Sequence, residues 1–301
     1  MKLRSFFGFG PSLYFVPRLL QLTYQYLETP AKFLPSPRRT FNVSIESLRE
    51  HIPLAFVPIC GQERIDNGDC VCEKRFGWLK VVQSPDWNAR AVVFNDIVKK
   101  EIIVAFRPSN TLRNWVADTG ALLIPFPGAN DGAMVHEGFL DHFTKIKEPV
   151  LKELEWRLQL RAFENYTVHI LGYSLGGALA ILSIPAFHDL MTKYHHKISY
   201  TAYTAPRVGN QAFASLIDSL SVDLVRYTIR NDIVSLLPPR RFGFVHPGLE
   251  FHAIVVGSST AILPCDPQYD EDPNCSLAAD NFLKFTHYYP DNHPVPDPLF
   301  C

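Results

Sequence analysis

The sequence predicts an α/β protein in which helices cover a central, mostly parallel β-sheet, and three observations support that prediction. Apolar segments of strand length alternate with amphipathic segments of helical length, which is the pattern of a parallel sheet with covered faces. The 301 residues are enough for one large hydrophobic core. No internal repeat or linker interrupts residues 41–301, so we expect one domain there.

The expected elements begin soon after residue 41. A helix is expected at 44–56, with Ser44 as its N-cap, because apolar side chains recur there at helical spacing. Alternating or apolar runs of strand length predict strands at 91–96, 101–106, 166–171, 198–202, 224–229 and 251–256, and helical spacing predicts helices at 141–160 and 212–220. The helix after residue 174 should kink or end at Pro185, which has no N–H donor.

Residues 1–40 are interpreted as a pre- or pro-segment that precedes the folded domain at 41–301. Their charged start and the apolar residues after it resemble a secretion leader. Two glycines and Pro11 interrupt the apolar run, and no small-residue cleavage site follows, so the leader is atypical.

Charge and hydropathy exclude several classes of partner. With 29 basic and 30 acidic residues the net charge is −1, which disfavours binding to nucleic acid and docking to anionic lipid by charge. No segment approaches the run of about 18 apolar residues that a membrane span requires, so we expect no integral membrane span. We expect the chain to act as a monomer, and its motifs imply no metal and no organic cofactor.

Six cysteines indicate disulfides and an oxidising compartment. They lie in one group near the N-terminal third and another towards the C-terminus: Cys60, Cys70, Cys72, Cys265, Cys275 and Cys301. An even number fits a disulfide set, whereas zinc ligands need pairs with a wider gap than Cys70-Val71-Cys72 provides. Three Asn-x-Ser/Thr sequons, at Asn42, Asn165 and Asn274, agree with a secreted, extracellular protein.

The segment Gly172-Tyr173-Ser174-Leu175-Gly176 is the strongest functional signal. It lies between an apolar run of strand length and small, helix-forming residues, which is the layout of a nucleophile elbow. Ser174 is the predicted nucleophile, and the backbone N–H of Leu175 is a predicted oxyanion donor. The alternative is a glycine-containing strand-to-helix turn with an incidental serine, and the flanking strand and helix favour the enzyme.

A serine hydroxyl is a weak nucleophile until a histidine accepts its proton and a carboxylate orients that histidine. Asp232 is the best candidate for the acid, because it follows the strand at 224–229 and should lie at the same sheet edge as Ser174. Among the histidines downstream of Asp232, His287 is preferred, because it lies in a C-terminal loop that can fold over the sheet edge. The acidic run at 266–272 is expected to be a solvated loop.

The loop after the strand at 101–106 is expected to complete the site. In an enzyme with a nucleophile elbow this loop supplies the second oxyanion donor, so Ser109 is the candidate. In the short helix that follows, Leu112, Trp115 and Val116 share one face by their spacing. That face is either an ordinary apolar surface packed inward or a cover over the site.

These motifs resemble the fungal class 3 lipases, the triacylglycerol lipases of filamentous moulds, from about residue 41 to residue 301. The resemblance is carried by Phe106-Arg107 with Ser109, by residues 113–118, 135–139, 172–178 and 206–210, by 231–234 with 237–239, and by 244–248 with Glu250. It implies an α/β-hydrolase fold with a mobile helical lid at about 110–122, which includes Leu112, Trp115 and Val116. It also implies a catalytic triad of Ser174, Asp232 and His287, and oxyanion donation by Ser109 and Leu175.

The resemblance also implies disulfide pairings, and the sequence departs from the family pattern at two positions. By resemblance Cys60 pairs with Cys301 and Cys265 with Cys275; a third pair, Cys70 with Cys72, would close an unusually tight ring. Tyr173 stands where the family usually has histidine, but the Gly-x-Ser-x-Gly frame is intact. Pro108 stands where the family usually has glycine, and it stiffens the first hinge of the implied lid.

The expected reaction is hydrolysis of a carboxylic ester through an acyl-Ser174 intermediate, with His287 as base and then acid. The implied apolar lid favours a triacylglycerol lipase that acts on acylglycerol at a lipid–water interface. Two alternatives remain. One is a feruloyl-type or short-chain esterase on the same scaffold, and the other is a catalytically inactive lipid-binding protein.

Overall fold

The computed structural model describes residues 43–66, 75–86, 89–109, 122–129, 132–230, 232–256 and 259–278. These ranges contain the whole strand-turn-helix unit around Ser174 and the strand that leads to Asp232. Several predictions lie outside them: the segment 1–40, the lid residues Leu112, Trp115 and Val116, the cysteines Cys70, Cys72 and Cys301, and the candidate base His287.

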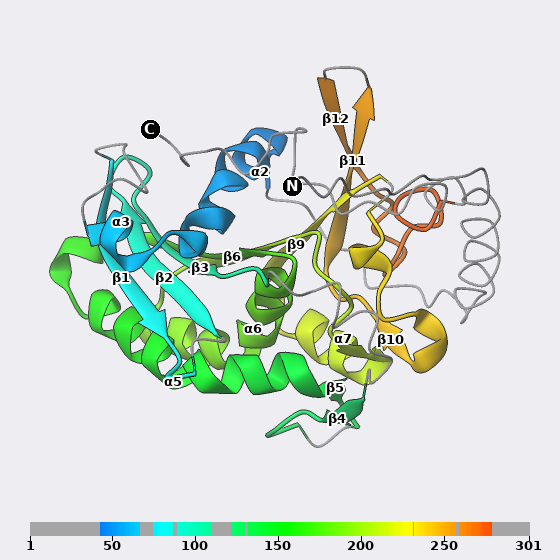
Figure 1. Ribbon diagram of the computed structural model, residues 1–301, viewed down its shortest axis with the longest axis horizontal. Helices are drawn as coiled ribbons and strands as arrows, with labels where there is room; N and C mark the ends of the chain where they lie inside the picture. The colour runs from blue at the N-terminus through cyan, green and yellow to red at the C-terminus, as the bar shows by residue number, and fades with distance from the viewer. Residues whose placement is uncertain are drawn as a thin grey trace, which may run out of the picture.

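An eight-stranded sheet runs through the described part of the chain (Figure 1). Its order is β1 (Phe76–Gln83), β2 (Arg90–Asp96), β3 (Glu101–Phe106), β6 (Thr167–Tyr173), β7 (Ile198–Tyr203), β9 (Asp223–Ile229), β11 (Leu249–Val256) and β12 (Ser259–Pro264). Strands β3 to β11 pair in parallel, and the remaining pairings are antiparallel. The predicted α/β architecture is therefore confirmed.

The parallel strands bring the candidate residues to one edge of the sheet. The carboxyl ends of parallel strands lie together, and the register pairs Phe106 at the end of β3 with Gly172 near the end of β6. From this edge the chain leaves β3 towards Ser109, β6 towards Ser174 and β9 towards Asp232. The sheet thus assembles, from distant parts of the sequence, the edge at which the predicted chemistry would take place.

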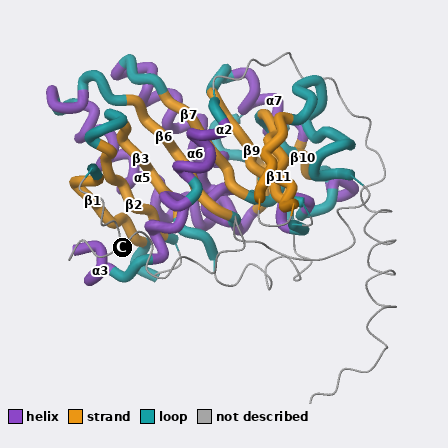
Figure 2. The backbone as a smooth tube through the Cα atoms, turned by 90° about the horizontal axis from the view of Figure 1, so that it is seen from above, coloured by secondary structure: helices purple, strands orange, loops and turns teal. Residues whose placement is uncertain are grey.

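Helices cover both faces of the sheet (Figures 1 and 2). One face carries α5 (Glu137–Leu158), α6 (Leu175–Tyr194) and α7 (Gln211–Ser219), and the other carries α2 (Ile45–His51) with the 3₁₀ helix η2 (Pro53–Ile59). Buried apolar side chains form one cluster on each side, and α5 and α6 contribute to the larger one. Because both faces are covered, β2 and β3 are buried over almost their whole length.

The helix predicted at 44–56 is shorter than expected. Ser44 is its N-cap, as predicted, and its side chain accepts a hydrogen bond from the backbone N–H of Ser47 at 3.0 Å. The α-helix ends at His51, because Pro53 has no N–H with which to continue the hydrogen-bond ladder. The chain continues as η2 and then as α3 (Gln62–Asp66).

The prediction for Pro185 is a kink or an end of the helix; α6 continues past Pro185 to Tyr194, so the prediction of an end is wrong. A proline inside a helix costs about 3 kcal/mol. Burial of the apolar side chains of α6, each worth roughly 1.5–3 kcal/mol, outweighs that cost. The helix is long and apolar enough to cross a membrane, but 67% of its most apolar window is buried inside the protein, as in a core helix.

A second, four-stranded sheet joins the segment before α5 to the segment before α7. Its order is β10 (Phe244–Val245), β8 (Gly209–Asn210), β5 (Met134–His136) and β4 (Leu123–Pro125). Asn210 links its parts, because its side-chain oxygen accepts hydrogen bonds from the backbone N–H groups of Met134 and Phe213, each at 3.0 Å. The bond from Phe213 also makes Asn210 the N-cap of α7.

Candidate active site

The turn at Ser174 has the geometry expected of a nucleophile elbow. Ser174 lies between β6 and α6 with φ 58° and ψ −119°, a backbone conformation that costs a non-glycine residue about 1–3 kcal/mol. Flanking glycines leave room for the turn. A Cβ at Gly172 would lie 2.2 Å from the backbone of Gly176, and a Cβ at Gly176 would lie 2.2 Å from the carbonyl oxygen of Phe106. The start of α6 therefore packs directly on the backbone of β6 and of the neighbouring strand β3.

The hydroxyl of Ser174 is buried and available for chemistry. The backbone N–H donates to the carbonyl oxygen of Tyr203 at 2.8 Å, which ties the elbow to β7. The residue is 1% exposed, and within the described ranges its Oγ has no hydrogen-bond partner. A buried, unpaired polar atom costs about 1–3 kcal/mol, so its presence in a native fold calls for a functional explanation. A catalytic base or a bound substrate would provide that explanation, and the candidate base, His287, lies outside the described residues.

The predicted oxyanion donors lie at the same edge. Leu175 is the first residue of α6, so its N–H belongs to the turn whose N–H groups have no intrahelical acceptors. Ser109 follows β3, the strand whose last residue, Phe106, packs against Gly176. The partial positive charge at the start of α6 also favours an anion there. This arrangement can stabilise negative charge that develops on a substrate oxygen next to Ser174.

Asp232 is buried just beyond the end of β9, with β7 between its strand and the strand of Ser174. It is 3% exposed, its N–H donates to the carbonyl oxygen of Ile229 at 3.0 Å, and its Oδ1 accepts from the N–H of Val234 at 2.9 Å. These bonds fix the direction of the carboxylate. A buried, oriented carboxylate at this edge suits the role of holding and charge-stabilising an imidazole.

The loop that follows Asp232 is anchored by Arg207, a residue for which the sequence predicted no role of its own. Arg207 is fully buried, and its Nη1 donates to the carbonyl oxygens of Leu236 and Pro238, the latter at 2.9 Å. Its backbone N–H donates to the carbonyl oxygen of Leu237 at 2.7 Å. One arginine therefore fixes the path of the chain that leaves the candidate acid.

Glu271 neutralises Arg207, and this corrects the prediction of a solvated loop at 266–272 for its second half, residues 270–272. Glu271 is fully buried, accepts from Nη2 of Arg207 at 2.7 Å and forms an ion pair with Arg240 at 3.0 Å. Burial opposes ionisation of Glu271, but the charges of Arg207 and Arg240 hold the pKa of its carboxyl well below the usual range. Residues 270–272 are buried, and arginines from distant parts of the chain pair with Glu271 there, whereas Asp266 and residues 268–269 are exposed.

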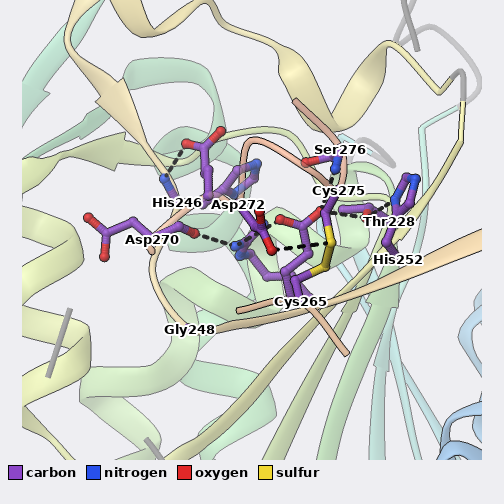
Figure 3. Close-up of polar contacts among 12 residues, drawn as sticks. Thr228, His246, Gly248, His252, Cys265, Asp270, Asp272, Cys275 and Ser276 are labelled. Atoms are coloured by element: carbon purple, nitrogen blue, oxygen red, sulfur yellow. Dashed lines mark hydrogen bonds and ion pairs between the residues drawn. A yellow bond between two sulfur atoms is a disulfide. The ribbon is translucent and has the colours of Figure 1, made fainter. Parts of the chain in front are cut away.

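The loop that carries Glu271 is closed by the disulfide Cys265–Cys275, which confirms one of the predicted pairings (Figure 3). Two further bonds tie this loop to the sheet, one from Nη2 of Arg226 to the carbonyl oxygen of Asp270 at 2.6 Å and one from the N–H of Ser276 to Oε1 of Glu250 at 3.1 Å. Arg226 lies on β9 and Glu250 on β11, so the disulfide loop is fastened to the strands next to the candidate acid.

Two other histidines downstream of the candidate acid lie within the described residues and make structural contacts. His246 is buried, its Nε2 donates to the carbonyl oxygen of Ser235 at 2.8 Å, and burial lowers its pKa well below the usual range. Nδ1 of His252 lies 2.9 Å from the hydroxyl oxygen of Thr228, and His252 is also buried. Their contacts explain these two histidines without a catalytic role, and His287 stays a prediction.

Tyr173, which replaces the histidine usual in the resembling family, is a core residue. It is 2% exposed, and its ring packs against Phe56 of η2 with centroids 4.8 Å apart. The substitution therefore serves packing on the face of the sheet opposite α6. Cys60 is disulfide-bonded, and its predicted partner Cys301 lies outside the described residues.

Two groups of described residues bring possible metal ligands together, but their donors do not suit a shared ion. His51, Glu101 and His169 have ligand atoms within 4.8 Å of one another. The two imidazole rings are stacked at 4.2 Å with 17° between their planes, so the in-plane lone pairs of their nitrogens run alongside each other instead of converging. The second group relies on Cys265 and Cys275, whose sulfurs are joined to each other.

Comparison with known proteins relates part of the chain to a family. Residues 103–242 match the family model for Lipase (class 3). The chain is 34% identical over 191 residues to the lipase of Rhizomucor miehei, which covers 61% of this chain and 51% of that protein. It is 32% identical over 188 residues to the secreted mono- and diacylglycerol lipase A of Penicillium cyclopium, which covers 60% of this chain and 59% of that protein. The chain therefore spans between half and three fifths of the length of these curated relatives.

Comparison with a solved structure identifies the fold. The triacylglyceride lipase of Rhizomucor miehei superposes on this chain with a TM-score of 0.69 at 25% identity, covering 83% of this chain and 97% of that one. The residues matched by the family model include the nucleophile elbow and the loop that carries Asp232. The fold is the α/β-hydrolase fold, and residues 103–242 are similar to the class 3 lipases.

Proposed function

We propose that this protein hydrolyses carboxylic esters of glycerol, with triacylglycerol as its main substrate, through an acyl-enzyme formed on Ser174. The observation that carries the proposal is the elbow, where a serine with φ 58° holds a buried Oγ without a partner in the described part of the chain. The named activities of the relatives support the substrate class, since they are a lipase, a mono- and diacylglycerol lipase and a triacylglyceride lipase.

In the proposed reaction, His287 accepts the proton of Ser174 Oγ as that oxygen attacks the ester carbonyl. Asp232 orients His287 and stabilises the imidazolium that forms. Ser109 and the N–H of Leu175 stabilise the oxyanion, and removing one such donor costs about 2.7–4 kcal/mol of transition-state stabilisation. His287 then protonates the departing alcohol, and water repeats the sequence to release the fatty acid.

A lipid substrate suits the apolar residues of the proposed lid segment. The proposed lid residues Leu112, Trp115 and Val116 share one apolar face by sequence spacing. Leu122, the first described residue after that segment, is 55% exposed. Contact with a lipid–water interface would cover such apolar side chains and shift the lid towards an open state. A feruloyl-type or short-chain esterase on this scaffold would gain no rate from an interface.

Fatty acid release from emulsified triacylglycerol tests the proposal, with Ser174→Ala as the matched control. We expect hydrolysis by the wild-type protein and a loss of roughly 10⁵- to 10⁶-fold in kcat in the variant. Equal rates for the two proteins would overturn the proposal. Rates on p-nitrophenyl esters of short and long chains, above and below their solubility limit, separate the activities, because only a lipase gains rate above the limit.

We also propose that the protein is secreted as a monomer whose mature chain begins near residue 41. One relative is a secreted enzyme, and the disulfide Cys265–Cys275 suits an oxidising compartment. N-terminal sequencing of the protein recovered from the culture medium of its native host checks the secretion and the start of the chain. Retention of the whole protein inside the cells would contradict the first, and a start near Met1 the second.

A further inference from the structure

An exposed aromatic cluster lies at the amino-terminal end of the parallel strands, opposite the edge that carries Ser174. Trp78 on β1 and Trp156 on α5 are 56% and 47% exposed, and their rings are stacked with centroids 5.9 Å apart. The ring of Phe163 packs edge-on against Trp78 at 5.5 Å, and Tyr166 packs edge-on against Phe163 at 4.9 Å. The four rings form one continuous cluster, and two large apolar side chains at its outer end are left in water.

An unusual backbone conformation at Trp78 directs this side chain outward. Trp78 has φ 53°, which is rare for a bulky residue, and it lies in a register shift between Gly77 and Lys80 of β1. Its carbonyl oxygen accepts a hydrogen bond from Nη2 of Arg157, whose guanidinium is buried. A strained conformation persists only when its surroundings determine it, and such strain concentrates at sites with a function.

A glycosylation sequon borders the cluster. The segment Phe163-Glu164-Asn165-Tyr166-Thr167 interleaves the sequon residues Asn165 and Thr167 with two aromatic members of the cluster. The N–H of Tyr166 donates to the carbonyl oxygen of Phe163 at 2.9 Å, which closes a turn, and Glu164 and Asn165 are exposed at its tip. Glycan acceptors lie in surface loops and turns of this kind.

We propose that Asn165 carries an N-linked glycan whose first sugar rings pack on the exposed faces of Trp78 and Trp156. In the transfer, the amide nitrogen of Asn165 loses a proton and bonds to the anomeric carbon of a lipid-linked oligosaccharide, and the lipid diphosphate leaves. A pyranose ring has an apolar face of C–H groups, which matches an aromatic surface. The proposal rests on the secretion proposed above, since the donor belongs to the secretory pathway.

The other described sequon provides an internal control. In Asn274-Cys275-Ser276 the middle residue is joined to Cys265, and Ser276 is buried with its N–H bonded to Glu250. Disulfide formation and burial of the hydroxyl residue both compete with glycan transfer at Asn274. We therefore expect Asn165 to be occupied in most molecules and Asn274 in few.

Peptide mass spectrometry tests the modification. The full chain is secreted from yeast behind a host secretion signal, and the glycans are removed enzymatically in ¹⁸O-water, which marks each occupied asparagine. Heavy label at Asn165 that disappears in Thr167→Ala is the expected result. An unlabelled Asn165 in the wild-type protein would overturn the proposal. Because this readout does not involve ester hydrolysis, it is independent of the proposed activity.

Thermal unfolding then tests the packing. Enzymatic removal of the glycan is expected to lower the Tm of the wild-type protein by about 2 °C, because the cluster is uncovered. In Trp156→Ala the same treatment should change the Tm by less than half as much, and Trp78→Ala provides a second, independent variant. Equal shifts in the wild-type protein and both variants would show that the sugar extends into solvent, which would overturn the packing part of the proposal.

Discussion

Replacing Gly176 by alanine should damage the elbow more than any exposed substitution of the same size. The added Cβ would lie 2.2 Å from the carbonyl oxygen of Phe106 and 3.2 Å from the carbonyl carbon of Arg107. These are backbone atoms of β3 and the residue after it, so no side chain can rotate away. To avoid this overlap, α6 must move off the sheet by about 1 Å. The expected loss of unfolding free energy is about 3–5 kcal/mol, at the upper end of the range for overpacked cores.

Two assays measure this effect, with Gly61→Ala as the matched control, because a Cβ there meets nothing within 4 Å. We expect Gly176→Ala to unfold at a Tm about 10 °C below wild type, and Gly61→Ala to stay within about 2 °C. Below its transition Gly176→Ala should still lose about 10²-fold in kcat, since Ser174 and the N–H of Leu175 shift with the start of α6. Equal unfolding temperatures for the two variants would contradict this prediction.

Two further predictions concern pH and the disulfide loop. Burial lowers the pKa of His136 from 6.5 to about 4 in the folded protein. As pH falls below 6.5, this histidine is therefore protonated in the unfolded chain before it is protonated in the folded one. The folded state loses stability relative to the unfolded state between pH 6.5 and about pH 4. His136→Asn keeps an acceptor for the N–H of Gly138 but cannot titrate. Between pH 7 and pH 4 this variant should therefore lose about 3 kcal/mol less unfolding free energy than wild type, as measured by urea titrations. Equal losses in the two proteins would contradict this prediction. Replacing Cys265 and Cys275 by serine should lower the unfolding free energy by roughly 3 kcal/mol, and no change would show that the closed loop contributes nothing.

The elbow could be predicted because its determinants are local. The apolar strand, the two glycines and the small residues of α6 lie within a short stretch of sequence, and each is required by the sterics of one turn. Asp232 could be predicted because a parallel sheet brings the ends of its strands to a common edge. The six predicted strands are found as β2, β3, β6, β7, β9 and β11, since alternation and apolar runs are local signals, whereas β1, β12 and the strands of the smaller sheet were not predicted.

The support of the acid loop could not be predicted in this way. Arg207 and Glu271 are 64 residues apart, and Glu271 lies in a run of acidic residues that is typical of a solvated surface. Only the tertiary fold shows that Arg207 and Arg240 neutralise Glu271 in the interior. Pro185 shows a second limit, because its local cost is known but the burial of α6 that outweighs it is a property of the whole core.

Covalent trapping of Ser174 by an alkyl phosphonate tests the central claim most directly, because the reaction requires the nucleophile, its base and the oxyanion hole together. Mass spectrometry should find one adduct per chain, on the peptide that contains Ser174, and none in Ser174→Ala. Labelling should slow by orders of magnitude in His287→Ala and Asp232→Asn. A folded wild-type protein, shown by cooperative thermal unfolding, that leaves Ser174 unlabelled would contradict the account.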